Sequence, residues 1–299
     1  MDFATATSLD DALAAIAAGA RPIAGGTDLV VGARVGKAML PDSVIAIDRI
    51  AELATVGSAA DHLRIGALVT HATLMTDPSL VALCTALSDA AALIGSPATR
   101  HIGTLGGNVM NGSPAMDTGA PLVVLGATAE LRSADATRTV SMADLWTGPG
   151  QTSAAPDELC TALLVPTRPD RSGSAYVRLE YRRAMEIAVV GAAASVTLGD
   201  DGTIAAACVA LAAVAPTIIE VRGVADAVAS ASVADAAAAV AALASEQASP
   251  ISDVRASDAY RRHCVGVMAS RALDAAARRA AGEHIPVPVN RALGIGAAS

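Results

Sequence analysis

Two glycine pairs, each placed where an extended segment gives way to a helical one, constrain the fold of this chain most. The first lies in Ala24-Gly25-Gly26-Thr27-Asp28 and the second in Thr104-Leu105-Gly106-Gly107-Asn108. A glycine pair lacks two Cβ atoms and permits positive φ, so successive backbone N–H groups can surround an anion. Two such loops far apart in the sequence therefore predict two halves of one diphosphate-binding site.

The composition is that of a globular chain with enough apolar residues for two domains. The chain has 299 residues, of which 53% are hydrophobic and only 2% aromatic. Small side chains, above all alanine, must therefore fill the cores, and neighbouring elements must pack closely. The net charge of −8 and the scattered arginines exclude a nucleic-acid surface, which needs a basic face with stacking aromatics.

Other classes of site and location are disfavoured by the same sequence. The four cysteines are widely separated, which favours buried thiols over a zinc or locally encoded iron–sulfur site. The longest apolar run, residues 204–219, is shorter than the roughly 20 residues that a spanning helix needs. Since the first residues also lack a signal-peptide pattern, we expect no transmembrane segment and a cytoplasmic location.

The order of the segments predicts an α+β fold with two α/β lobes in the first domain, residues 1–167. Lobe 1–55 should be a β-loop-α-β unit, and lobe 56–167 should hold helices and a sheet. The expected elements of the first lobe are a helix Leu9–Ala18, a strand near Arg21–Ala24, a helix Leu29–Val35 and a strand Val44–Asp48. Those of the second are a strand Leu63–Val69, helices Ser79–Ile94 and Met116–Leu125, and strands near Ala129–Leu131, Thr139–Val140 and Leu159–Val165.

A second, smaller α+β domain is expected over residues 173–282, after the linker-like segment Arg168–Gly173. Three antiparallel strands and two helices should build it, and residues 283–299 should form a tail that a partner orders from Pro286 on. The strands are Ala175–Tyr181, Ala188–Leu198 and Thr203–Val214, and the helices are Ser232–Ser245 and Asp253–Ala281.

The residues that flank the glycine pairs favour a ligand site over plain turns. Neither loop contains the GxGxxG fingerprint, which disfavours Rossmann-type NAD binding. Thr27 and Asp28 supply a hydroxyl and a helix-capping carboxylate, while Thr104 and Asn108 offer further polar groups to a diphosphate or ribityl chain. Asp117 can accept from sugar hydroxyls, and it can also cap a helix that begins near Thr118.

Three segments that occur in this order carry a family resemblance. They are Pro22–Leu29, then Gly103–Asn108 with Ser113–Asp117, and then Arg182–Ala188. Together they resemble the FAD-binding medium subunit of the molybdenum hydroxylases, the xanthine dehydrogenase and aerobic carbon monoxide dehydrogenase family, over the chain to about Ala281. The resemblance implies a two-lobed, PCMH-type domain that holds FAD noncovalently, and a domain like the C-terminal domain of the CO dehydrogenase flavoprotein that closes over the flavin.

The resemblance also implies which positions hold the cofactor. Ile94 would pack near it, Asp117 would follow the second motif, and Cys160 would make a backbone contact. Relatives often carry a lysine near the flavin where this chain has Arg178, which keeps the positive charge; the alternative is an exposed strand arginine. The diphosphate and ribityl chain would lie against Ile23, Ala24, Gly25, Gly26, Thr27, Asp28, Leu29, Gly103, Thr104, Gly106, Gly107 and Asn108.

The function implied is that of an electron-transfer subunit without catalytic or metal-binding residues of its own. By resemblance, electrons leave the substrate at a molybdopterin centre in a large subunit and pass through the 2Fe-2S clusters of a small subunit. They then reach FAD here and an external acceptor, and the resemblance implies a dimer of heterotrimers. Thr27-Asp28, where CO dehydrogenase relatives tend to have His-Ser, favours a purine or other N-heteroaromatic substrate. The alternatives are a CO dehydrogenase medium subunit, a stand-alone FAD oxidase or dehydrogenase, and a flavin-free scaffold.

Overall fold

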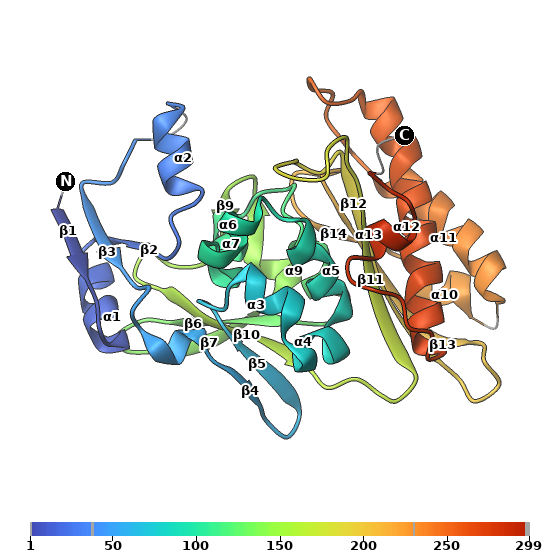
Figure 1. Ribbon diagram of the computed structural model, residues 1–299, viewed down its shortest axis with the longest axis horizontal. Helices are drawn as coiled ribbons and strands as arrows, with labels where there is room; N and C mark the ends of the chain where they lie inside the picture. The colour runs from blue at the N-terminus through green and yellow to red at the C-terminus, as the bar shows by residue number, and fades with distance from the viewer. Residues whose placement is uncertain (1, 37–38, 230, 297–299) are drawn as a thin grey trace.

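The computed structural model describes residues 2–36, 39–229 and 231–296, and it places two lobes and a C-terminal domain in a row (Figure 1). The first lobe lies at one end of this row and the C-terminal domain at the other. Within the described ranges, no helix has the length and apolar character needed to cross a bilayer.

The first lobe is the expected β-loop-α-β unit with one additional strand. Its parallel sheet has the order β1-β3-β2, formed by β1 (Asp2–Thr5), β3 (Ser43–Ala46) and β2 (Arg21–Ile23). Helix α1 (Leu9–Ala17) is capped by Ser8, whose hydroxyl accepts from the backbone N of Asp11 at 3.2 Å. Helix α2 (Leu29–Arg34) follows the first glycine loop and buries none of its residues, and η1 (Ala51–Ala54) leads into the second lobe.

The second lobe is built on an antiparallel sheet of order β4-β5-β10-β6-β7, which includes the strands predicted for it. The predicted helix 79–94 is instead two helices that break at Cys84, and the first of them starts at Asp77, whose carboxylate caps it. The strands are β4 (Val56–Ser58), β5 (His62–Gly66), β6 (Thr128–Arg132), β7 (Thr137–Ser141) and β10 (Leu159–Pro166), with a hairpin of β8 (Trp146–Gly148) and β9 (Gln151–Thr152). The helices are α3 (His71–Thr76), α4 (Pro78–Leu83), α5 (Thr85–Leu93), α6 (Pro97–Ile102), α7 (Leu105–Asn111), α8 (Gly119–Val124) and α9 (Met142–Leu145).

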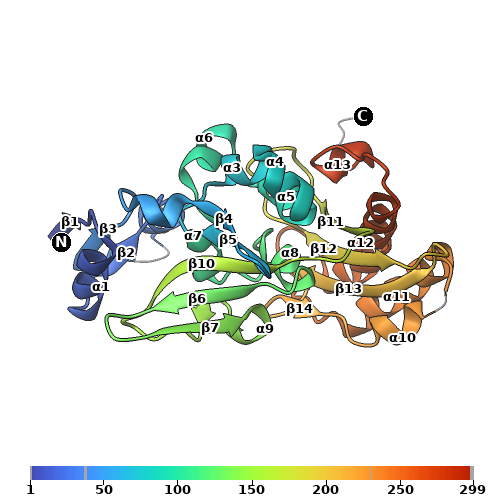
Figure 2. The ribbon, with the colours of Figure 1, turned by 90° about the horizontal axis from the view of Figure 1, so that it is seen from below.

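The C-terminal domain is an antiparallel sheet covered by helices on one face (Figure 2). The three predicted strands are present, and a short fourth strand follows them because the chain turns at Ala213, which has a φ of 63°, and then returns along β13. The strands are β11 (Ser172–Leu179), β12 (Val190–Leu198), β13 (Ile204–Ala212) and β14 (Ile219–Glu220). The helices are α10 (Val224–Val228), α11 (Val233–Gln247), α12 (Asp258–Ala280) and α13 (Val289–Ala292).

Small residues let this sheet pack tightly on both faces. Ala192 and Ala194 belong to the core shared with α11 and α12, whereas Ala193 and Ala210 belong to the core of the second lobe. A Cβ on Gly173 would overlap the carbonyl oxygen of Ala276, so β11 and α12 are in direct backbone contact. The core of the second lobe therefore extends onto one face of the C-terminal sheet, and a separate core lies on the other face.

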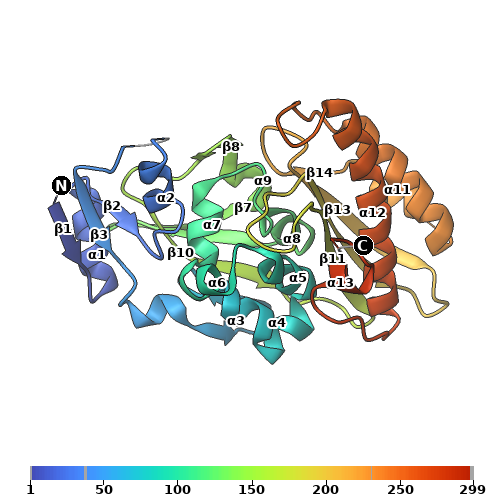
Figure 3. The same ribbon diagram turned by 45° about the horizontal axis from the view of Figure 1, so that its top comes forward.

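The end of the chain corrects the expectation of a tail that only a partner orders. Val289 and Asn290 are fully buried, and α13 lies beside β11 between α5 and α12 (Figure 3). The segment is ordered by its own chain because these residues find partners on β11 and α5.

Candidate functional site

The two glycine loops line one groove of about 590 Å³ between the first and second lobes. This volume is within the range of about 300–1,000 Å³ that is usual for small-molecule and cofactor sites. Figure 3 shows α2 and α7, the helices that follow the two loops, in the neighbouring lobes. The predicted residues that line the groove are Ile23, Ala24, Gly25, Gly26, Thr27, Asp28, Leu29, Gly103, Thr104 and Gly107.

The two glycines of each pair have different roles, one in packing and one at the groove surface. A Cβ on Gly25 would overlap the backbone carbonyl of Ile102, and one on Gly106 would lie 2.5 Å from the Cβ of Ala67. The second members differ, since Gly26 has a φ of 65° and Gly107 would meet only its own capping hydroxyl. The first glycine of each pair thus lets two segments approach closely, and the second shapes the groove surface.

The first loop presents a run of backbone donors to the groove. In the part of the chain that the structure describes, the N–H groups of residues 25–29 have no acceptor. The carbonyls of this loop are used instead, because Gly26 accepts from Val30 N at 3.0 Å and Asp28 accepts from Gly32 N at 2.8 Å. Successive N–H groups with no partner around a groove are the donor set that a diphosphate requires, so these residues fit the FAD that the sequence predicts.

The second loop, by contrast, is satisfied by its own chain. Gly106 N donates to Ala67 O at 2.8 Å, and Gly107 N donates to the Thr104 hydroxyl at 3.1 Å. The side-chain Oδ1 of Asn108 accepts from the Thr118 hydroxyl at 2.6 Å, so this side chain links α7 to the residue before α8. This loop is a rigid wall of the groove, and a direct part for Asn108 in cofactor binding stays a prediction.

Asp28 does not play the capping role expected of it. It stands at the N-terminus of α2, yet its side chain makes no capping hydrogen bond and its backbone is already helical. Desolvation raises the pKa of this carboxyl group above its usual value. The groove therefore contains an exposed carboxyl group without a capping bond, which can accept from a hydroxyl of a bound ligand.

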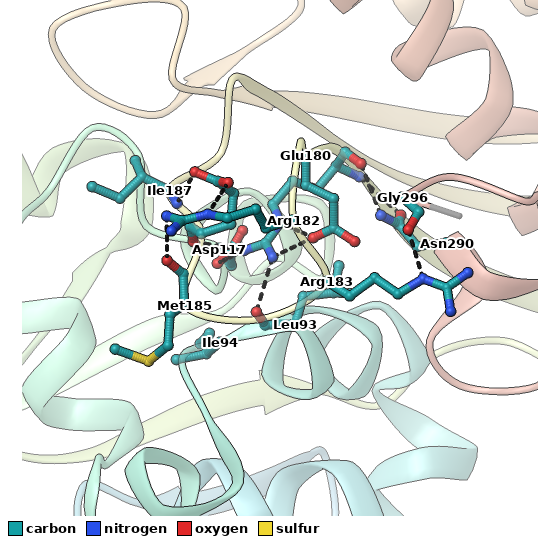
Figure 4. Close-up of polar contacts among 12 residues, drawn as sticks. Leu93, Ile94, Asp117, Glu180, Arg182, Arg183, Met185, Ile187, Asn290 and Gly296 are labelled. Atoms are coloured by element: carbon teal, nitrogen blue, oxygen red, sulfur yellow. Dashed lines mark hydrogen bonds and ion pairs between the residues drawn. The ribbon is translucent and has the colours of Figure 1, made fainter. Parts of the chain in front are cut away.

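Asp117, which is labelled in Figure 4, forms a buried ion pair with Arg178 outside the groove lining, and this overturns one alternative role of each residue. Arg178 is fully buried rather than an exposed strand arginine, and its Nη1 donates to Asp117 at 2.8 Å. Asp117 accepts at its other oxygen from the Tyr176 hydroxyl at 2.7 Å, so it does not cap α8. Burial alone lowers the pKa of Arg178, but Asp117 and Glu180 raise it above its usual value, and the guanidinium stays cationic.

The other predicted residues lie at the margins. Gly106 and Cys160 line a smaller cavity of about 100 Å³ that shares Ala24 and Gly107 with the groove. Burial raises the pKa of the Cys160 thiol to about 12, so it is not a reactive thiol. Ile94 ends α5 outside the groove, and its carbonyl accepts from Arg100.

Several groove residues were not predicted. Ile187 lies in Arg182–Ala188, one of the three segments that carry the family resemblance, but it was not among the predicted site residues. Arg21 and Pro22 belong to the predicted strand before the first loop, and Val31, Gly32 and Val35 belong to the predicted helix after it. Met110 and Asn111 have no such pattern, and the tertiary fold brings them to the groove.

Comparison with known families assigns both parts of the chain. A family model described as the FAD binding domain in molybdopterin dehydrogenase matches residues 1–168. A second, described as the CO dehydrogenase flavoprotein C-terminal domain, matches residues 174–276. The fold and the site thus define a two-domain FAD-binding flavoprotein. The chain belongs to the family of FAD-binding subunits of molybdopterin dehydrogenases, and it is an oxidoreductase subunit.

Relatives and solved structures are similar over most of this chain. The putative xanthine dehydrogenase FAD-binding subunit of Escherichia coli K12 is 34% identical over 73% of this chain and 76% of its own length. The carbon monoxide dehydrogenase medium chain of Afipia carboxidovorans is 32% identical over 87% of this chain and 90% of its own. The structure of reconstituted CO dehydrogenase from Oligotropha carboxidovorans superimposes with a TM-score of 0.89 at 30% identity, covering 93% of this chain and 98% of that one.

Proposed function

We propose that this chain binds FAD noncovalently along the groove, with the diphosphate at the N–H groups of residues 25–29. That run of donors without acceptors is the observation that carries the proposal, and the second loop forms the opposite wall. FAD, when bound, supplies the redox chemistry, while the protein supplies orientation and electrostatics. The electrons would come from 2Fe-2S clusters in a small subunit and go to an external acceptor.

The organic substrate of the whole complex is proposed to be a purine or another N-heteroaromatic compound, oxidised in a large molybdopterin subunit. Two similar chains bear the names xanthine dehydrogenase and nicotinate dehydrogenase, and Thr27-Asp28 follows the first glycine pair. Similarity to CO dehydrogenase medium chains keeps carbon monoxide as the second candidate. Turnover by the purified complex with purines, pyridine carboxylates and carbon monoxide separates them.

The proposal includes the assembly and the division of the chain. FAD would lie between lobes 1–55 and 56–167, and the domain over residues 173–282 would close over the flavin. Two copies each of the small, medium and large subunits would form a dimer of heterotrimers. The mass of the purified complex tests this assembly.

FAD binding is tested by titrating the flavin-free chain with FAD and, in parallel, with FMN. FMN keeps the isoalloxazine ring, the ribityl chain and one phosphate, but it lacks the second phosphate and the adenosine, so it loses at least two of the bonds to residues 25–29. With charge-assisted hydrogen bonds worth about 1.5–3 kcal/mol each, FAD should bind at least about 100-fold more tightly than FMN. Acid precipitation of the complex should release the flavin, and equal affinity for FMN and FAD would refute the placement of the diphosphate.

A further inference from the structure

Strand β11 is an edge strand whose open side is covered by side chains from three parts of the chain. It pairs with β12 on one side only, so alternate backbone groups point away from the sheet. Ser174 O accepts from Arg279 at 2.8 Å, and Tyr176 N donates to Asp89 at 3.2 Å. The third position, Arg178, is covered by Asn290. Unpaired edge groups are a liability that native folds cover, and here the end of the chain completes the cover.

Asn290 takes the place of a neighbouring strand at Arg178. Its Oδ1 accepts from Arg178 N at 3.0 Å, and its Nδ2 donates to Arg178 O at 2.8 Å. An amide side chain is suited to this because it offers an acceptor and a donor at once. The adjacent Val289 N donates to Asp89 at 2.9 Å, which anchors the segment to α5 of the second lobe. Residues 285–296 follow the last residue matched by the C-terminal family model.

The guanidinium group of Arg178 connects β11 to the second lobe and to the loop that follows β11. Its Nη2 donates to Leu93 O at 2.9 Å, and its Nη1 donates to Asp117 and, at 3.4 Å, to Glu186 O. Glu186 belongs to the 181–187 loop, which connects β11 to β12. The backbone of Arg178 is therefore held on one side by Asn290, while its side chain holds this loop on the other.

A second contact joins the end of the chain to the same loop. Arg183 Nε donates to Gly296 O at 2.6 Å, as Figure 4 shows. The loop is also fixed to the second lobe, since Met185 N donates to Gly95 O at 3.0 Å. At its far end, Ile187 is exposed by 47% and lines the groove that the two glycine loops form.

We propose that the C-terminal segment 285–296 is a positioning element of the FAD groove, in which Asn290 and Gly296 hold the 181–187 loop so that Ile187 forms a wall of the groove. Asn290 is a positioning residue, because it acts through Arg178 and does not line the groove. The inference rests on the proposed function for its statement about FAD, whereas its statement about the loop stands on the contacts alone.

The test is native-state cleavage by trypsin after the exposed residues Arg182 and Arg183, which becomes faster when the loop is released from its contacts. In the flavin-free full-length chain, Asn290→Leu keeps a similar volume and removes both hydrogen bonds to Arg178. Cleavage in the loop, located by mass spectrometry, should become about tenfold faster or more, because it follows the population of the open form. FAD affinity should fall by about tenfold in the same variant.

Two further variants make the result decisive. Arg291→Ala, an exposed neighbour on α13, should leave both measurements within twofold of the unmodified chain. Gly296→Ala keeps Asn290 but places a Cβ 2.7 Å from Glu180 Oε1, so it should also accelerate cleavage. If Asn290→Leu does not fold, the cleavage rate of Gly296→Ala tests whether the C-terminal segment holds the loop.

The failure of this inference is distinguishable from that of the proposed function. A folded Asn290→Leu chain with unchanged cleavage and unchanged FAD affinity would overturn the inference and leave the proposed function intact. If the unmodified chain does not bind FAD, the proposed function fails, while the cleavage rates still report on the loop. Faster cleavage with unchanged FAD affinity would show that the segment holds the loop but does not shape the groove, which contradicts the proposal.

Discussion

The adjacent residues Gly106 and Gly107 should respond to the same substitution in opposite ways. An alanine at Gly106 places its Cβ 2.5 Å from the Cβ of Ala67 and 2.8 Å from the Ala67 carbonyl oxygen. At Gly107 the nearest atom is the hydroxyl oxygen of Thr104, at 2.9 Å, and the new methyl group lies at the groove. Gly106→Ala should therefore damage the fold, and Gly107→Ala should damage the site.

The size of each effect follows from these contacts. The Gly106 segment must move by about 1 Å to reach ordinary van der Waals separation, and overpacking of this kind costs about 1–3 kcal/mol. Helix propensity returns up to about 1 kcal/mol, so the net loss of unfolding free energy should be about 1–2 kcal/mol. At Gly107 the same gain offsets a weakened cap worth about 1 kcal/mol, which leaves stability nearly unchanged. A methyl group in the groove should weaken FAD binding by about tenfold, or about 1.4 kcal/mol.

Urea denaturation of the flavin-free chains measures the first effect, and FAD titration measures the second. Gly57→Ala is the control for both, since this exposed strand glycine has nothing within 4 Å of its Cβ position. If Gly106→Ala is as stable as the unmodified chain, the close contact with Ala67 does not constrain this loop. If Gly107→Ala binds FAD with unchanged affinity, Gly107 is not in the cofactor path.

Two further predictions concern buried charges. Arg279→Met should lower the free energy of unfolding by about 3 kcal/mol because it leaves Asp89 buried without its cation. Arg278→Met, on the exposed face of α12, is the control and should cost less than about 1 kcal/mol. Equal losses in urea denaturation would contradict this. Burial holds the pKa of His71 at about 4, so the unfolded chain takes up this proton near pH 6.5 and the folded chain does not. Stability should therefore fall by up to about 3 kcal/mol between pH 7 and pH 4, and His71→Phe should remove that part of the slope. An unchanged slope in urea denaturation of His71→Phe would contradict this.

The local parts of the site could be predicted from the sequence because glycine pairs and caps are local signals. The two loops, their strand-to-helix positions and the β-loop-α-β lobe follow from Gly25-Gly26, Gly106-Gly107 and the periodicity around them. Helix α1 begins at its predicted cap, Ser8, for the same reason. The break at Cys84 depends on packing that no local pattern encodes, whereas the cap at Asp77 is a local signal that the predicted boundary missed.

The interior polar network could not be predicted because its members are far apart in the sequence. The carboxylate of Asp117 meets the guanidinium of Arg178 across 61 residues, and Arg279 meets Asp89 across 190. An arginine in a strand predicts solvent exposure, and only the tertiary fold supplies the two carboxylates that allow Arg178 to be buried. The anchored end of the chain was missed for the same reason, since Asn290 is buried only once β11 is in place.

The two sides of the groove therefore differ in what stabilises them. On the side of the second lobe, the N–H groups of Gly106 and Gly107 are satisfied, and the 181–187 loop is fixed by Arg178, Gly95 and Gly296. On the side of the first lobe, the N–H groups of residues 25–29 have no acceptor in the described chain, and α2 buries none of its residues. A ligand that bonds to those donors adds its binding free energy to the stability of the first lobe, and the preformed wall limits the entropy that binding costs. The fold thus builds one wall of the site in advance and leaves the other to be completed by the cofactor.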